Sequence, residues 1–276
     1  GARWLSAELG CPVWLKAENL QRTGSFKIRG AYVRIKNLTA EEKSRGVVAA
    51  SAGNHAQGVA LAAQMLGIRA TVYMPEGAPI PKLNATRGYG AEVRFHGAFL
   101  DESIVEARKY AEETGAIFIH PFDHVDIVRG QGTAGLEIYE QAPEAQTIVV
   151  PLGGGGFLAG IAIAVKESCR RDGRPEPRVI GVQAKDAAAY PPSLMAGRPI
   201  PAKNMKTMAD GIAVGLPGMV PFQAIQDYVD DVITVSEQAM SRAMVMLLER
   251  AKLVAEPAGA AAVAAIQENP SAFRDL

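Results

Sequence analysis

The stretch Thr147-Ile148-Val149-Val150-Pro151-Leu152-Gly153-Gly154-Gly155-Gly156 joins a short apolar run to four consecutive glycines. The apolar run is typical of a buried strand, and the strongly apolar residues 157–171 that follow predict a helix. Glycine lets the backbone approach a ligand closely, and several N–H groups at a helix N-terminus can then point at one anion. The sequence therefore predicts a strand, loop and helix that together bind a phosphate group.

Three kinds of phosphate ligand compete for this loop. An ATP-binding loop needs Lys-Ser or Lys-Thr straight after its glycines, whereas Phe157 follows here. A dinucleotide fingerprint is met only loosely by Gly154, Gly156 and Ala159, and the next predicted strand ends in Gln183 instead of the acid that binds the ribose. A compact cofactor phosphate is therefore favoured, and the structural alternative is that the glycines only allow tight packing of strand against helix.

Strands and helices alternate along most of the chain. Strands are predicted at residues 47–51, 70–74, 91–95, 116–119, 147–152, 179–182 and 231–235, and helices at 28–38, 56–66, 79–87, 101–114, 157–171 and 237–253. This alternation is typical of parallel sheets covered by helices. The prediction is an α/β fold of two lobes, each a mostly parallel sheet covered by helices. Residues 1–46 and 125–276 would form a large cofactor-binding domain, with residues 47–124 inserted in it as a small domain.

Three other segments carry weaker signals. Residues 11–18 alternate in polarity, which predicts one more strand. Residues 128–133 contain two glycines and predict a loop that leads into a helix. The prolines within residues 191–201 predict an irregular surface segment.

The bulk composition excludes several classes of partner. The 276 residues include 29 lysines and arginines against 29 aspartates and glutamates, so the net charge gives no reason to expect nucleic acid or an anionic membrane. Apolar runs stay shorter than the roughly 18 residues that a membrane-spanning helix needs. Cys11 and Cys169 have no metal-binding spacing and are typical of reduced thiols in a cytoplasmic protein, with one disulfide between these distant residues as the alternative.

A second informative stretch reads Ser25-Phe26-Lys27-Ile28-Arg29-Gly30-Ala31. It places one lysine at or just before the start of a predicted helix. A helix N-terminus and burial both disfavour the charged form of a lysine, and a nucleophilic lysine must be neutral. Lys27 is therefore a candidate nucleophile, although an exposed lysine in a first helical turn explains this stretch alone equally well.

Two more glycine-bearing stretches complete the pattern, Ser51-Ala52-Gly53-Asn54-His55 and Gly130-Gln131-Gly132-Thr133. In order and spacing, the four stretches resemble the fold-type-II (tryptophan-synthase-β-like) enzymes that use pyridoxal 5′-phosphate (PLP), and within them the threonine dehydratases. The resemblance runs through nearly the whole chain. It implies PLP as the cofactor and a homodimer or homotetramer as the assembly.

The resemblance also implies a role for each motif. Lys27 would form a Schiff base with PLP and later move protons, Phe26 would lie against the pyridine ring, and Gly211 would line the pocket near the ring. The phosphate would be held by Gly153, Gly154, Gly155, Gly156 and Phe157. The substrate carboxylate would be held by Ser51, Gly53, Asn54 and His55, and Asn54 would also bind the ring hydroxyl. A structural role remains the alternative for His55.

The implied reaction is an α,β-elimination that converts L-threonine to 2-oxobutanoate and ammonia, and L-serine to pyruvate. An L-serine dehydratase is an open alternative, because one methyl group separates the two substrates. A catalytically silent PLP-binding protein is another alternative. The sequence leaves open whether the enzyme would serve isoleucine biosynthesis or threonine breakdown.

The chain departs from the related serine racemases, which are a further alternative. Racemases have a serine where Ala52 stands, so racemisation should be weak. Gln183 and Ala189 replace two acids that bind a divalent metal in racemases, so we expect no such metal site. His120 and His124 are four residues apart, but the intervening proline interrupts a helix that would align them. The N-terminal segment of the dehydratases and their C-terminal Ser-Gly-(Gly/Ala)-Asn strand are not found in this chain.

Overall fold

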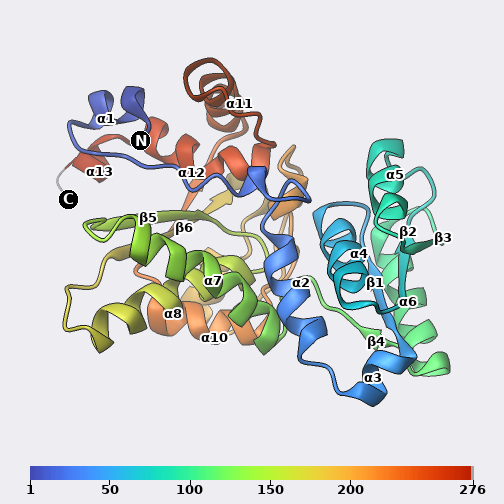
Figure 1. Ribbon diagram of the computed structural model, residues 1–276. Coiled ribbons are helices and arrows are strands. Elements are labelled where there is room, and N and C mark those ends of the chain that lie inside the picture. Colours follow the sequence, from blue (N-terminus) through green and yellow to red (C-terminus); the bar gives the residue numbers. More distant parts are fainter. Residues whose placement is uncertain (275–276) are drawn as a thin grey trace. The chain divides into compact units, whose positions relative to one another are not determined.

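The computed structural model describes residues 1–274, and the chain forms two compact units (Figure 1). Unit 1 comprises Gly1–Ala17 and the residues from Gly132 onwards, and unit 2 comprises Glu18–Gln131. The predicted small domain, residues 47–124, falls within unit 2, which also takes in residues 18–46. Compact units and domains are different divisions of a chain, so the predicted domain boundaries stay a prediction. The last two residues of the predicted large domain lie outside the described residues.

Unit 2 contains a four-stranded sheet in the order β3-β2-β1-β4, and every neighbouring pair is parallel. The strands are β1 (Val47–Ala50), β2 (Ala70–Met74), β3 (Glu92–Phe95) and β4 (Ile117–Phe118). Its helices are α2 (Lys27–Lys36), α3 (Ala40–Arg45), α4 (Asn54–Leu66), α5 (Ile80–Gly88) and α6 (Leu100–Thr114), with a single 3₁₀ turn at Glu18–Leu20. Parallel neighbours need a crossover, and helices provide it here.

The two faces of this sheet are covered by different helices. Successive strand residues point to opposite faces. Accordingly Val47 and Ala49 belong to the apolar cluster that includes α2 and α4, whereas Val48 and Ala50 cluster with Ala107 of α6. The β1 strand is buried on both faces, which is why its sequence is continuously apolar instead of alternating.

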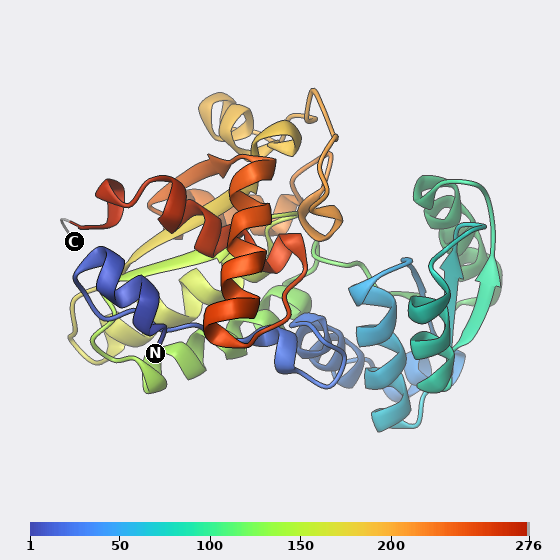
Figure 2. The same cartoon turned by 90° about the horizontal axis from the view of Figure 1, so that it is seen from above.

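Unit 1 contains a three-stranded parallel sheet in the order β5-β6-β7. The strands are β5 (Thr147–Pro151), β6 (Arg178–Ala184) and β7 (Asp231–Val235). The helices of this unit are α1 (Arg3–Leu9), α8 (Gly156–Arg171), α9 (Tyr190–Ala196), α10 (Met219–Tyr228), α11 (Glu237–Met246), α12 (Pro257–Glu268) and α13 (Ser271–Arg274). Shorter turns are 3₁₀ at Lys185–Ala187 and Asp210–Ile212 and π-helical at Leu247–Ala251. Figures 1 and 2 show α12 on one side of the sheet and α8 on the other.

The prediction of an α/β fold with parallel, helix-covered sheets is confirmed. The prediction of a strand at residues 11–18 is wrong. The backbone of Val13 in this segment forms hydrogen bonds with α1 and with the residue before it, not with another strand. The Ala2 amide donates to the Val13 carbonyl at 2.8 Å, and the Val13 amide donates to the Ser6 hydroxyl at 2.9 Å. Among residues 1–274, no helix combines the length and apolar character needed to cross a membrane.

The proline-rich segment is also more regular than predicted. Pro191 and Pro192 lie in the first turn of α9, where backbone N–H groups have no partner within the helix. Proline is therefore compatible with the start of this helix, and the prediction of an irregular segment is wrong for residues 190–196.

The glycines of residues 128–133 lie inside a helix, not in a loop. Helix α7 spans Val125–Gln141, and the division between the two units falls within it. A Cβ on Gly130 would lie 2.5 Å from the Arg29 carbonyl oxygen of α2. The buried Gln131 side chain accepts a hydrogen bond from the Gly30 amide at 3.2 Å. Gly130 therefore allows the backbones of α7 and α2 to approach each other, a tertiary role that the sequence alone does not reveal.

Candidate active site

The tetraglycine loop connects β5 to α8, as predicted. Gly155 has φ +104° and ψ −16°, a backbone conformation that costs an L side chain free energy. A Cβ there would also overlap the hydroxyl of Tyr190 and come within 3.0 Å of Ile225 and Pro221. Glycine is therefore required at this position by the backbone and by the available space.

Hydrogen bonds from two neighbouring elements hold this loop. The fully buried Tyr190 donates its hydroxyl to the Gly154 carbonyl at 3.0 Å, and the Gly218 amide donates to the same oxygen at 3.2 Å. The Gln183 side chain donates to the Leu152 carbonyl at 3.3 Å and accepts from the Tyr190 amide at 2.9 Å. Gln183, which stands where a ribose-binding or metal-binding acid would be needed, thus positions the loop.

Gly211 lies beside the tetraglycine loop. A Cβ on Gly153 would be 3.1 Å from the Ile212 Cα and 3.4 Å from the Gly211 carbonyl oxygen. A Cβ on Gly211 would in turn be 3.3 Å from the carboxylate of Glu256, the residue that precedes α12. The predicted residues of unit 1 therefore come together. Glu256 is an acid next to them that carries no local sequence signal of a site.

Lys27 is the first residue of α2, which confirms its predicted place at a helix N-terminus. Its Nζ donates to the Pro121 carbonyl at 2.9 Å and lies 5.3 Å from the centre of the Phe26 ring. Ala31 and Ile35 anchor α2 in the apolar core that also contains α4. The lysine is thus carried by a helix that packs tightly, which fixes where its amine can reach.

The Ser51–His55 stretch forms the turn between β1 and α4. The Ser51 hydroxyl accepts a hydrogen bond from the Gly53 amide at 3.0 Å, and α4 begins at Asn54. Amides in the first turn of a helix have no partner within it and favour anionic ligands. The turn is therefore suited to bind a carboxylate.

The side chain of His55 is buried and held by the backbone. Its Nε2 lies 2.8 Å from the Ile119 carbonyl oxygen, which can only accept, so Nε2 carries the proton. Burial, together with the charge of Lys27, lowers the pKa of His55 to about 3. The neutral ring supplies no positive charge, so its backbone N–H is the group that can bind a carboxylate. The imidazole ring of His55 therefore fits the structural role that was the alternative to substrate binding.

The two other histidines singled out from the sequence stabilise turns. Nδ1 of His120 accepts from the amides of Phe122 at 3.2 Å and Asp123 at 2.8 Å, and Nδ1 of His124 accepts from the Asp126 amide at 3.0 Å. Burial is the main cause that lowers the pKa of His120 to about 4. Within residues 1–274, the structure brings together no group of three metal-ligating side chains.

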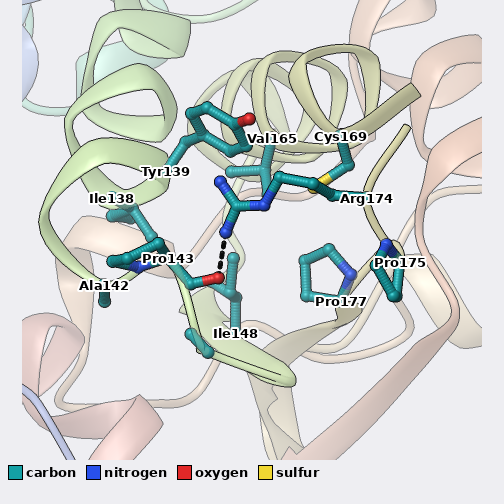
Figure 3. A pocket seen from close by; sticks show the side chains of 11 residues that line it. Ile138, Tyr139, Ala142, Pro143, Ile148, Val165, Cys169, Arg174, Pro175 and Pro177 are labelled. Atoms are coloured by element: carbon teal, nitrogen blue, oxygen red, sulfur yellow. Dashed lines mark hydrogen bonds between the residues drawn. The ribbon is translucent and has the colours of Figure 1, made fainter. Parts of the chain in front are cut away.

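A small cavity in unit 1 involves none of the predicted site residues. It has a volume of about 20 Å³, room for roughly one water molecule. Figure 3 shows Tyr139 and Arg174 beside it, with the Arg174 guanidinium donating to the Pro143 carbonyl and the buried Cys169 at its edge. Its size excludes it as a site for a cofactor.

The residues present fit PLP chemically. The glycine loop, where a Cβ at position 155 has no room, suits a phosphate group, and the Lys27 amine suits an aldehyde. The predicted set falls in both units, with Phe26, Lys27 and the Ser51–His55 turn in unit 2 and the glycine loop and Gly211 in unit 1. Their individual roles stay predictions.

Comparisons with known proteins bear on the identity of the chain. It is 50% identical over 262 residues to the L-threonine ammonia-lyase of Thermotoga maritima, an alignment that covers 95% of this chain and 64% of that enzyme. The chain therefore spans less than two thirds of that relative's length.

Two solved structures are similar across the whole fold. The processed form of threonine deaminase isoform 2 from Solanum lycopersicum has a TM-score of 0.94 and 37% identity, covering 99% of this chain and 78% of that one. Maize serine racemase has a TM-score of 0.92 and 37% identity, covering 100% of this chain and 81% of that one. The profile of the pyridoxal-phosphate-dependent enzyme family matches residues 2–275. The chain belongs to the pyridoxal-phosphate-dependent enzyme family.

Proposed function

We propose that this chain is the catalytic part of an L-threonine ammonia-lyase, which eliminates water from L-threonine and then takes up one water as ammonia is released by hydrolysis, to give 2-oxobutanoate. L-Serine would give pyruvate by the same steps. The observation that carries the proposal is Lys27 at the start of α2, its amine beside Phe26 and held by the Pro121 carbonyl. The 50% identity to an L-threonine ammonia-lyase supports the choice of substrate.

Lys27 has two tasks in this proposal. Its amine would hold the cofactor covalently, and Nζ in its neutral form would take the α-proton of the bound substrate. PLP, when bound, supplies an electron sink for the charge left at the α-carbon. Phe26, adjacent to Lys27 and with its ring near Nζ, would lie against the cofactor ring.

The glycine loop binds the phosphate in this proposal. Gly153 to Gly156 and the Phe157 amide would direct backbone N–H groups at it. Each bond to a charged acceptor contributes about 1.5–3 kcal/mol, whereas the dipole of α8 adds only about 0.3–2 kcal/mol. The hydrogen bonds of the loop therefore contribute more to phosphate binding than the dipole of α8 does. The contacts of Tyr190 and Gln183 matter because they keep the loop in shape before the phosphate arrives.

The turn before α4 binds the substrate carboxylate in this proposal. Ser51, Gly53 and the first-turn amides of Asn54 and His55 hold it, and Asn54 also reaches the ring hydroxyl of the cofactor. Gly211, beside the glycine loop, would line the cofactor pocket. Anchoring the carboxylate fixes the α-carbon, so that Lys27 meets the α-proton and not another hydrogen.

Serine racemisation is the second candidate, because maize serine racemase has the same fold with a TM-score of 0.92. A racemase must add a proton to the face opposite Lys27. Ala52 has no hydroxyl to do so, which favours elimination over racemisation. An L-serine dehydratase differs from the main proposal only in substrate preference.

The proposal extends to the setting of the enzyme. We expect a homodimer or homotetramer that acts on small amino acids, without a nucleic-acid or membrane partner, in the cytoplasm. The balanced charge and the free thiols of Cys11 and Cys169 support this expectation.

The proposal is tested by an absorbance spectrum of the PLP-loaded protein together with an assay for 2-oxobutanoate. We expect the visible band of lysine-bound PLP and conversion of L-threonine in the wild type, and loss of both in Lys27→Ala. Lys36→Ala is the matched control, since Lys36 is an exposed lysine at the end of the same helix.

Other outcomes separate the alternatives. If the absorbance band of lysine-bound PLP is present but neither threonine nor serine yields a keto acid, the result would favour the catalytically silent PLP-binding protein. Formation of D-serine at a rate similar to pyruvate formation would favour the racemase. No band after addition of PLP would exclude the cofactor assignment.

A further inference from the structure

We propose that Lys82 is a positioning residue for the substrate carboxylate and restricts the site to amino acids with a free α-carboxylate. This rests on the proposed function, since it concerns the turn before α4 that would bind that group. Lys82 lies in the first turn of α5, and its Nζ is 3.7 Å from the point where a Cβ on Gly53 would stand. The ammonium group is therefore placed directly over the turn.

Electrostatics makes this placement informative. The N-terminus of α4 carries the positive end of the helix dipole, so a lysine ammonium beside it is unfavourable by itself. Two positive features, the N-terminus of α4 and the Lys82 ammonium, thus converge on residues 53–55. A bound carboxylate would remove the mutual repulsion and interact favourably with both.

The backbone around Lys82 is well fixed. Its amide donates to the Pro79 carbonyl at 3.0 Å, and its carbonyl accepts from the hydroxyl of the buried Thr86 at 2.9 Å. Helix α5 packs against α4, and Lys82 itself is half-buried. The side chain therefore starts from a rigid base, which limits how far its ammonium can move away from the turn.

The contact predicts a particular kinetic signature. The carboxylate stays charged from substrate binding through the removal of the α-proton, so Lys82 stabilises the bound substrate and the transition state equally. Such uniform binding lowers KM and leaves kcat unchanged. A loss confined to KM would distinguish Lys82 from a residue that takes part in the chemical step.

The experiment compares Lys82→Met, which keeps the length and removes the charge, with Lys82→Arg, which restores it. L-Threonine is titrated into the PLP-loaded proteins, and both the absorbance change and the steady-state rate are recorded. We expect Lys82→Met to raise the half-saturating concentration and KM about tenfold, with kcat within about twofold, and Lys82→Arg to recover most of the loss. Lys109→Met, which removes a lysine from the exposed Lys109–Glu113 pair on α6, should change neither.

L-Threonine amide, which has no carboxylate, supplies the decisive comparison. Its half-saturating concentration should be the same in wild type and Lys82→Met. An equal weakening for threonine and its amide, or a fall in kcat at constant KM, would overturn the proposal. If the wild type binds threonine but releases no keto acid, the proposed elimination fails, while the absorbance titration still decides the role of Lys82.

Discussion

At the scale of a single residue, burial decides how His55 behaves. The fold keeps its ring neutral, because burial and the charge of Lys27 lower its pKa from 6.5 to about 3. Between pH 3 and pH 6.5, this histidine binds a proton in the unfolded chain but not in the folded chain. The resulting stability is therefore complete above pH 6.5 and is lost progressively as the pH falls towards 3.

This gives a prediction for His55→Gln, whose amide can still donate to the Ile119 carbonyl. Between pH 7 and pH 5 the wild type should lose stability more steeply than this variant, by up to about 1.4 kcal/mol per pH unit for one proton. Urea unfolding at both pH values measures the difference. His96→Gln, which changes an exposed histidine, should keep the wild-type pH dependence. An unchanged pH dependence in His55→Gln would show that the buried ring is not its source.

Some residues could be found from sequence and others could not. Lys27 and the glycines of the loop stand in local patterns that carry their chemistry. Lys82 and Tyr190 give no such signal, because Lys82 is placed beside Gly53 and Tyr190 bonded to Gly154 only by the fold, and both glycines are distant from them in sequence. Their importance depends on the three-dimensional fold, which a single sequence does not display.

At the scale of the element, regular patterns were predicted well where local interactions dominate. The bounds predicted for β2 and β7 are those observed. Glycine and proline misled prediction where tertiary contacts set their role, as at Gly130 in α7 and Pro191 in α9. Glycine and proline usually indicate loops, and only the packing of the folded chain shows where they lie inside a helix instead.

The turn from β5 to α8 supports a stability prediction. Gly155→Ala should destabilise the protein by about 2–6 kcal/mol, since strain at positive φ and overpacking against Tyr190 each cost about 1–3 kcal/mol. Urea unfolding without PLP measures the loss. Gly88→Ala is the control, because Gly88 ends a helix, has no positive φ and has open space around it. It should be neutral or slightly stabilising. Equal midpoints for the two variants would contradict the proposed constraint.

At the scale of the whole molecule, the predicted site residues are distributed over both units. A ligand that binds only the folded protein raises its stability, by about 2.7 kcal/mol at a concentration one hundred times its Kd. We therefore expect the unfolding midpoint of the protein to rise with PLP concentration and to fall again when PLP is removed by dialysis. Thermal unfolding followed by circular dichroism measures this. Lys27→Ala should show a smaller rise at each concentration, and a wild-type midpoint independent of PLP would argue against binding to the folded chain.

Unit 1 is assembled from two segments, since Leu5 and Leu9 of α1 share one apolar core with Ala260 and Ala264 of α12. On the ribosome, the first segment emerges long before its partner exists. At about 5–20 residues per second, the wait is on the order of ten to fifty seconds. The continuous residues 18–131 can fold in that interval, while the apolar face of α1 stays uncovered. Biosynthesis of this chain therefore includes a period in which a chaperone has an exposed apolar segment to shield.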